Sequence, residues 1–181
     1  MQEIYINLDD SGKLTKKELL SVYGGIVFLS KKEKDKFITQ YRSIINDIKC
    51  KYCKNKSTCN KKCPEIKNTN IKNSDKRRIM NYIKKYFVVG LIINNQNVYD
   101  HIIENKAAKG RFIDYSLRRM IKEIINNQIS NHNISENKPL KVVVNIDEQT
   151  TKSNGYYNLH DGLVEELKYG ISNFNYACIY N

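Results

Sequence analysis

The sequence predicts a single α/β domain over residues 1–181, with a five-stranded sheet and flanking helices. Five short apolar stretches have the length of strands, and longer stretches with apolar residues at helical spacing lie between them. Strands that alternate with helices along a chain are typical of α/β folds. With 181 residues, of which 40% are hydrophobic and 28% charged, the chain is long enough to bury a core of its own.

The first strands are predicted over residues 3–9 and 22–29, and the short connection between them favours a hairpin. Gly24 and Gly25 in the second strand indicate a bulge or a close approach of two backbones. The continuous apolar run at residues 87–93 predicts a buried strand. The remaining strands are expected over residues 140–146 and 174–180.

Four helices are predicted from apolar residues at helical spacing. Ser30 and Glu33 match a capping box, which places the start of the first helix directly after Ser30. Ser74 is the expected N-cap of the second helix, which is strongly basic. Residues 98–110 are expected to be irregular. The predicted helices span residues 31–49, 75–85, 111–130 and 159–169.

Four of the five cysteines lie within 14 residues, at Cys50, Cys53, Cys59 and Cys63. Closely spaced thiolate pairs are typical of a structural zinc site, which we expect to hold together an inserted knuckle over residues 49–73. The spacing is also compatible with an iron–sulfur cluster or with free thiols. The sequence therefore predicts a Zn²⁺ site with four cysteine ligands, with these two alternatives open.

Positive charge is concentrated in one segment. The net charge is +12, but residues 31–90 alone contain 18 Lys and Arg against 5 Asp and Glu, which leaves −1 for all other residues. Such a segment typically binds phosphate groups, most often those of nucleic acid. A Lys-, Asn- and Ile-rich composition also arises in AT-rich genomes whatever the function, and a basic helix face can be merely solvated. The residues predicted to bind nucleic acid are Lys51, Lys54, Lys56, Lys61, Lys62, Lys76, Arg77, Arg78, Lys84 and Lys85.

Two of the predicted strands end in acidic residues. Asp9 and Asp10 end the first strand and precede a Ser-Gly turn, and Asp147 and Glu148 follow the fourth strand. Carboxylates at strand ends are held rigidly, and they are ligands that Mg²⁺ and Mn²⁺ prefer. Asp-Asp-Ser-Gly is also favourable turn chemistry, so an exposed turn is the alternative interpretation of the first pair.

Three short motifs resemble those of the DUF3800 family, whose members have a ribonuclease H-like fold. Residues 6–12, Ile-Asn-Leu-Asp-Asp-Ser-Gly, resemble the family's Asp-Glu-Ser-Gly opening, with Asp10 in place of Glu. Residues 65–67, Glu-Ile-Lys, resemble its Glu-x-Lys segment, and residues 142–148 resemble its Ile-Asp-Glu strand end. The resemblance implies a mixed five-stranded sheet of the ribonuclease H type, and a phage or defence setting, in which family members often occur.

The resemblance also implies the residues of a catalytic site. Asp9 and Asp147 match the acids of the first and fourth strands. Asp114 lies in the first turn of the predicted long helix, where ribonuclease H-like enzymes often have a second acid. Glu65 and Lys67 match the Glu-x-Lys motif. Carboxylates of such a site hold two divalent cations, Mg²⁺ or Mn²⁺, for in-line hydrolysis of a phosphodiester.

Ribonuclease H-like enzymes commonly continue into a final helix that carries another acid, whereas this sequence ends at Asn181, after the predicted fifth strand. We therefore expect Asp10 and Glu148, or a partner protein, to complete the site, unless the scaffold is non-catalytic. A last strand near the sheet edge also favours a protein partner or self-association. Two functions follow: a metal-dependent nuclease for RNA or DNA, or a non-catalytic module that binds nucleic acid or inhibits a protein.

Other classes of protein are disfavoured by the sequence. No apolar run has the length of a membrane span, and the first residues lack the pattern of a signal peptide, so we expect a cytoplasmic protein without a membrane partner. The sequence contains no Gly-rich phosphate loop and no Ser-His-Asp signature.

Overall fold

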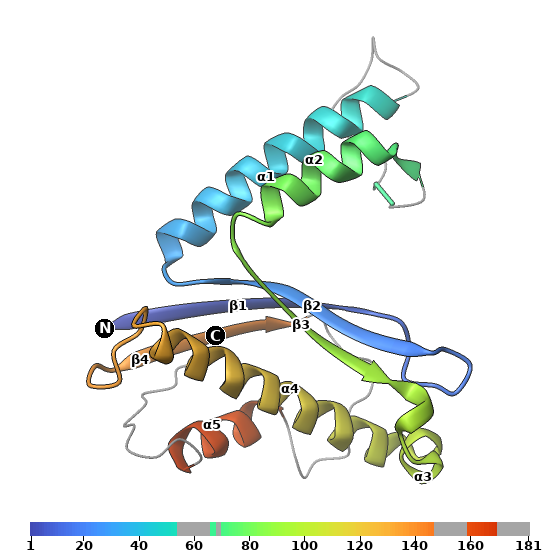
Figure 1. Cartoon of the computed structure of the whole chain (residues 1–181), viewed down its shortest axis with the longest axis vertical. Coiled ribbons are helices and arrows are strands. Elements are labelled where there is room, and N and C mark those ends of the chain that lie inside the picture. The colour runs from blue at the N-terminus through green and yellow to red at the C-terminus, as the bar shows by residue number, and fades with distance from the viewer. Residues whose placement is uncertain (54–65, 68–69, 147–158, 170–181) are drawn as a thin grey trace. The chain divides into compact units, whose positions relative to one another are not determined.

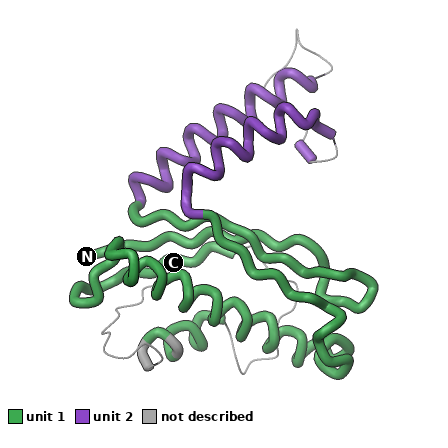
Figure 2. The backbone as a smooth tube through the Cα atoms, viewed as in Figure 1, with its two compact units in different colours: residues 1–30, 88–181 green, residues 31–87 purple. Residues whose placement is uncertain are grey.

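The chain forms two compact units in this computed structural model (Figure 2). Unit 1 comprises residues 1–30 and 88–181, and unit 2 comprises residues 31–87. Unit 2 contains all 18 Lys and Arg of the basic segment, so its formal charge is +13 against −1 for unit 1. The structure describes residues 1–53, 66–67, 70–146 and 159–169, without the side chains of Glu166, Lys168 and Tyr169.

The α/β fold is built on a mixed sheet of four strands, which are β1 (Gln2–Ser11), β2 (Leu20–Phe28), β3 (Phe87–Asn94) and β4 (Leu140–Ile146). Their order in the described part of the sheet is β3-β2-β1-β4. β1 pairs antiparallel with β2 and parallel with β4. The predicted α/β class and hairpin are thus confirmed. The fifth strand, predicted over residues 174–180, lies outside the described residues.

Helix α4 (Lys106–Ser130) covers one face of the sheet, and α5 (Leu159–Tyr169) packs against α4 (Figure 1). Alternate side chains of a strand point to opposite faces, so Ile4, Ile6 and Leu8 of β1 all point toward α4. Removal of these aliphatic side chains from water is the main source of stability. The side chains of this core with no exposed surface are Ile4, Ile6, Ile121, Ile125, Leu140, Val142 and Leu167.

The connection between β1 and β2 is held in place by one buried side chain, that of Asn95 in the short 3₁₀ helix η2 (Asn95–Asn97). Its Nδ2 donates to the carbonyl oxygens of Lys13, Thr15 and Glu18 at 3.0–3.1 Å. Its Oδ1 accepts a 2.9 Å hydrogen bond from the Ser21 hydroxyl. The two N–H groups of this buried amide are shared among three carbonyls, so Asn95 fixes the path of residues 13–20.

Unit 2 contains two paired helices, α1 (Lys31–Tyr52) and α2 (Asn73–Ile83). At one end an aromatic cluster joins them, in which the Phe37 ring stacks on Tyr82 with centroids 5.3 Å apart and meets Tyr86 edge-on. The Tyr82 hydroxyl donates to the Phe37 carbonyl or the Gln40 side chain, and burial raises its pKa above the ordinary value. This arrangement satisfies the one polar atom of a buried tyrosine.

At the other end, the buried carboxylate of Asp75 joins the start of α2 to the end of α1. It accepts hydrogen bonds from Lys51 Nζ at 2.7 Å and from the Tyr52 hydroxyl at 2.9 Å. The Tyr52 hydroxyl in turn accepts from the backbone N–H of Lys72, which is the N-cap residue of α2. Between the two ends, Arg78 pairs with Asp47 at 2.8 Å.

Three sequence predictions were wrong. Ser74 is not the N-cap of α2, because α2 begins earlier, after Lys72. Residues 98–110 are not irregular, since they form α3 (Asp100–Glu104) and the first turn of α4, which the Asn105 side chain caps. β3 is not buried, because it lies at the edge of the described sheet and exposes 51% of Val88 and 67% of Ile92.

Replacing Asp75 with asparagine is expected to lower the melting temperature at neutral pH. Hydrogen bonds from Lys51 and Tyr52 hold the pKa of Asp75 below its ordinary value of 3.8. An acid with a lowered folded-state pKa stabilises the fold fully above pH ~4, and this contribution is lost as the pH falls through the lowered pKa. Thermal melts at pH 7 and at pH 3 should therefore differ less for Asp75→Asn than for the wild type. Asp35→Asn, the same substitution on an exposed residue of α1, provides the control.

Candidate functional site

The two acids that end β1 lie on opposite faces of the sheet. Directly opposed residues of an antiparallel pair share a face, and Asp10 is paired with Tyr23, which belongs to the core under α4. Asp9 is paired with Gly24 on the other face, where a Cβ atom on Gly24 would meet nothing within 4 Å. Asp9 is therefore an exposed carboxylate beside open space. Its Oδ1 accepts a 3.0 Å hydrogen bond from the backbone N–H of Asp10.

The strand that precedes Asp147 lies beside the strand that carries Asp9. The parallel register of β1 and β4 pairs Asn7 with Asn145 and Leu8 with Ile146, which is the last described residue of β4. Asn145 Nδ2 donates to Asn7 Oδ1 at 2.9 Å on the same face as Asp9. Among the described residues, the buried Nδ2 of Asn7 has no hydrogen-bond partner. Asp147 and Glu148 themselves lie outside the described residues.

The backbone around Asp9 is closely packed. Gly12 has a φ of 83°, and a Cβ atom there would approach the Leu20 carbonyl oxygen to 2.7 Å. A Cβ atom on Gly25 would overlap the carbonyl oxygen of Asn7, which confirms the predicted close approach of two backbones. The Glu18 carboxylate accepts a 2.7 Å hydrogen bond from the Lys13 N–H. These contacts leave little space around the backbone at the end of β1.

Asp114 lies in α4, away from the face that carries Asp9. The prediction that it lies in the first turn of this helix was wrong, because α4 begins at Lys106, about two turns earlier. It is half-buried, and the removal of its carboxyl group from water raises its pKa, although the Arg118 guanidinium one turn later opposes this effect. Arg118 lies against α5, where a Cβ atom on Gly162 would come within 2.8 Å of its Nη1. Because α4 covers the face opposite Asp9, the structure does not bring Asp9 and Asp114 together on one face.

Within the described ranges, no three His, Cys, Asp or Glu side chains lie close enough to hold one metal ion. Cys50 is exposed in the last turn of α1 and Cys53 directly follows that helix, while Lys67 is exposed. The other predicted ligands and neighbouring residues lie outside the described part of the chain; they are Cys59, Cys63, Glu65, Lys54, Lys56, Lys61 and Lys62.

Of the ten residues predicted to bind nucleic acid, the six that the structure describes divide into two groups. Lys51 and Arg78 form ion pairs with Asp75 and Asp47, so they contribute to the contact between α1 and α2. The others lie on α2 or in the turn after it and, in the described part of the chain, have no ion-pair partner; they are Lys76, Arg77, Lys84 and Lys85. Among the described residues of this predicted set, the second group therefore offers positive charge that no carboxylate neutralises.

Three features near the site were not predicted from the sequence. Asn95 lies in the run Asn94-Asn95-Gln96-Asn97, whose composition indicates only a turn. Asn7 and Asn145 each occupy the position two residues before a strand-end acid, and that shared spacing is the signal that could have identified their contact.

Comparison with known protein families gives no matching family model for this chain. No curated protein matches its sequence. Of the helices that the structure describes, none combines the length and the apolar character that crossing a membrane requires.

Proposed function

We propose that the protein is a divalent-metal-dependent nuclease that hydrolyses phosphodiesters of RNA or DNA. The observation that carries this proposal is the parallel pairing of β1 with β4, which pairs Leu8 with Ile146 immediately before Asp9 and Asp147. Continuation of that register by one residue would set the two carboxylates side by side on the face that carries Asn7 and Asn145. Two adjacent carboxylates can hold a divalent cation, and such a cation can promote hydrolysis of a phosphodiester.

The chemistry of the donor set fits Mg²⁺ or Mn²⁺. Asp9 is an exposed oxygen ligand on a strand end, and Asn7 and Asn145 lie on the same face of the sheet. A divalent cation held by Asp9 and Asp147 would supply charge stabilisation for the phosphate and for the leaving oxygen. Asp10 and Asp114, which do not share the face of Asp9, are assigned no ligand role in this proposal.

The proposal also includes the fold family and a structural zinc site. The described strand order, with β1 between β2 and β4, supports a ribonuclease H-like sheet of the DUF3800 type. Cys50, Cys53, Cys59 and Cys63 are proposed to bind structural zinc, because the Asp75 contacts hold together the helix ends on either side of the cysteine cluster. About one zinc ion per purified chain, lost in Cys50→Ser, is the expected result of elemental analysis.

An alternative function is a non-catalytic module that binds nucleic acid or another protein. The observation in its favour is the exposed apolar edge of the described sheet, where Val88 and Ile92 project from β3. An edge strand with exposed apolar side chains pairs readily with a second chain or a second copy of this one. In that case unit 2 would supply the positive charge for binding, and Asp9 would have no catalytic role.

Cleavage assays separate the two functions. Single-stranded RNA, single-stranded DNA, both duplexes and the hybrid are incubated with the protein and Mg²⁺ or Mn²⁺. The nuclease proposal predicts cleavage of at least one substrate that stops on chelation and in Asp147→Ala. Binding of the same substrates without cleavage by the folded wild type would leave the alternative function.

A further inference from the structure

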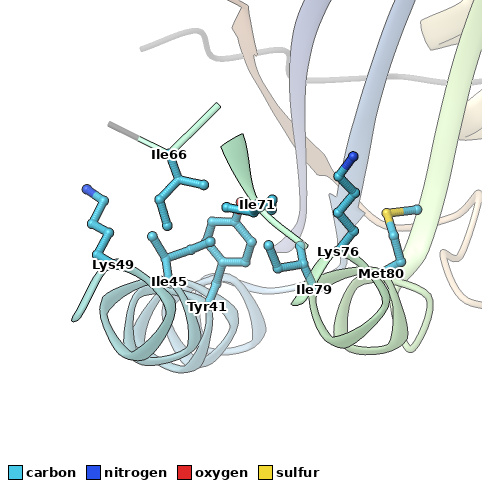
Figure 3. A pocket seen from close by; sticks show the side chains of 8 residues that line it. All are labelled: Tyr41, Ile45, Lys49, Ile66, Ile71, Lys76, Ile79 and Met80. Atoms are coloured by element: carbon cyan, nitrogen blue, oxygen red, sulfur yellow. The ribbon is translucent and has the colours of Figure 1, made fainter. Parts of the chain in front are cut away.

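Unit 2 contains a groove between α1, α2 and the segment that leads into α2 (Figure 3). Its volume is about 350 Å³, at the small end of ligand-binding pockets. All eight of these lining residues belong to unit 2. They are Tyr41, Ile45, Lys49, Ile66, Ile71, Lys76, Ile79 and Met80.

The wall of this groove is apolar, but its rim is cationic. Four isoleucines and the ring of Tyr41 line it while remaining half-exposed, and Met80 is 58% exposed at its edge. Figure 3 shows the chains of Lys49 and Lys76 extending from opposite sides of the groove. Among the described residues, neither ammonium group has an ion-pair partner. The groove therefore offers an apolar site between two lysine side chains.

We propose that this groove receives one unpaired base of a single-stranded nucleic acid, while Lys49 and Lys76 bind the phosphates on either side of that base. A base is a planar, largely apolar group that is always flanked by two negative charges, which matches one apolar wall between two lysines. The charge of +13 on unit 2 supports a polyanion rather than an isolated small anion. Bases within a duplex are stacked and cannot enter a groove, so the ligand is single-stranded.

An acidic amphipathic helix of a protein partner is the competing occupant. Such a helix uses several apolar anchors spaced along its length, and it therefore needs a long apolar groove. A volume of about 350 Å³ holds one planar ring rather than a row of anchors. The single-stranded ligand deepens the proposed nuclease function and rests on it, but binding in this groove is measurable without any cleavage.

Fluorescence anisotropy with labelled strands tests the proposal in the Asp9→Ala variant of the full chain, where cleavage is prevented. The probes are a short single strand, its duplex, and a strand of the same length made of abasic sites, which keeps the phosphates but lacks the bases. Stacking of one base contributes roughly 5- to 150-fold in affinity. The single strand is therefore expected to bind at least about fivefold more tightly than either of the other two probes.

Two neighbouring substitutions on α2 provide a matched pair. Met80→Glu places a negative charge at the edge of the groove, whereas Asn81→Glu places the same charge on an exposed residue that does not line it. Met80→Glu should abolish the preference for the single strand, and Asn81→Glu should retain it. Each of Lys49→Ala and Lys76→Ala should reduce the slope of log affinity against log salt by about 0.7.

Equal binding of the single strand, the duplex and the abasic strand would overturn the proposal, as would equal effects of Met80→Glu and Asn81→Glu. These outcomes are independent of cleavage. A base-dependent preference that disappears in Met80→Glu, found together with inactivity of the wild type on every substrate, would support the groove and contradict the nuclease.

Discussion

Asp9→Asn is expected to reduce phosphodiester cleavage about a thousandfold, with the substrate still bound. The substitution keeps the shape of the side chain but removes the negative charge that holds the divalent cation. Metal stabilisation of the transition state contributes several kcal/mol, and each ~1.4 kcal/mol corresponds to a factor of ten in rate. Asp9 is exposed, so the folded structure should tolerate the change. Single-turnover cleavage with saturating Mn²⁺ measures the effect.

The adjacent residue gives the control for this prediction. Asp10 has the same chemistry and is also exposed, but it shares its face of the sheet with Tyr23 and the core under α4. Asp10→Asn should therefore retain most of the cleavage activity. Equal losses of cleavage in Asp9→Asn and Asp10→Asn would show that activity does not depend on the face of the sheet on which the acid lies. The proposed pairing of Asp9 with Asp147 would then be contradicted.

Asn95→Ala is expected to lower the free energy of unfolding by about 3–5 kcal/mol. The substitution removes three hydrogen bonds to the backbone carbonyls of the β1–β2 connection and the partner of the Ser21 hydroxyl. In the variant, the carbonyl and hydroxyl groups that contacted Asn95 stay buried, where neither the protein nor water forms hydrogen bonds with them. This loss of hydrogen bonds accounts for most of the expected destabilisation. Urea denaturation of the full chain, followed by circular dichroism, measures the difference.

Two further variants test whether hydrogen bonding is the cause. Asn95→Asp preserves the shape but turns a carboxylate toward three carbonyl oxygens, so it should destabilise at least as much as alanine does. Asn97→Ala, on an exposed residue of the same 3₁₀ helix, should change the free energy of unfolding by less than about 0.5 kcal/mol. A loss below about 1 kcal/mol in both Asn95 variants would contradict the role assigned to this amide.

Much of the fold could be predicted from the sequence because periodicity and capping act locally. The spacing of Phe37, Tyr41 and Ile48 gives the buried side of α1, and Gly25 signals the close approach of β1 and β2. The position of β3 could not be predicted in this way. A continuous apolar run indicates a strand that avoids water, whereas the exposure of Val88 and Ile92 depends on the order of strands in the sheet, which is a non-local property.

The candidate site was predictable only in part for the same reason. The apolar run that ends in acids identifies Asp9 from the sequence. Which face of the sheet Asp9 and Asp10 each occupy follows only from the strand pairing in the structure. The roles of Lys51 and Arg78 likewise depend on their partners Asp75 and Asp47, which lie at least 24 positions away along the chain. A prediction from charge alone therefore does not distinguish Lys51 and Arg78, which join the two helices, from the lysines proposed to bind nucleic acid.

The insertion of unit 2 between β2 and β3 has a consequence for synthesis on the ribosome. All internal contacts of unit 2 lie within one continuous segment, residues 31–87, whereas the sheet of unit 1 joins Gln2 to Leu140. At about 5–20 residues per second, β4 is translated roughly 3–11 s after the last residue of unit 2. During that interval the nascent chain carries two basic helices and a β1–β2 hairpin whose edge toward β4 is unpaired. The edge of β1 that pairs with β4 thus remains open to chaperones until β4 has been synthesised.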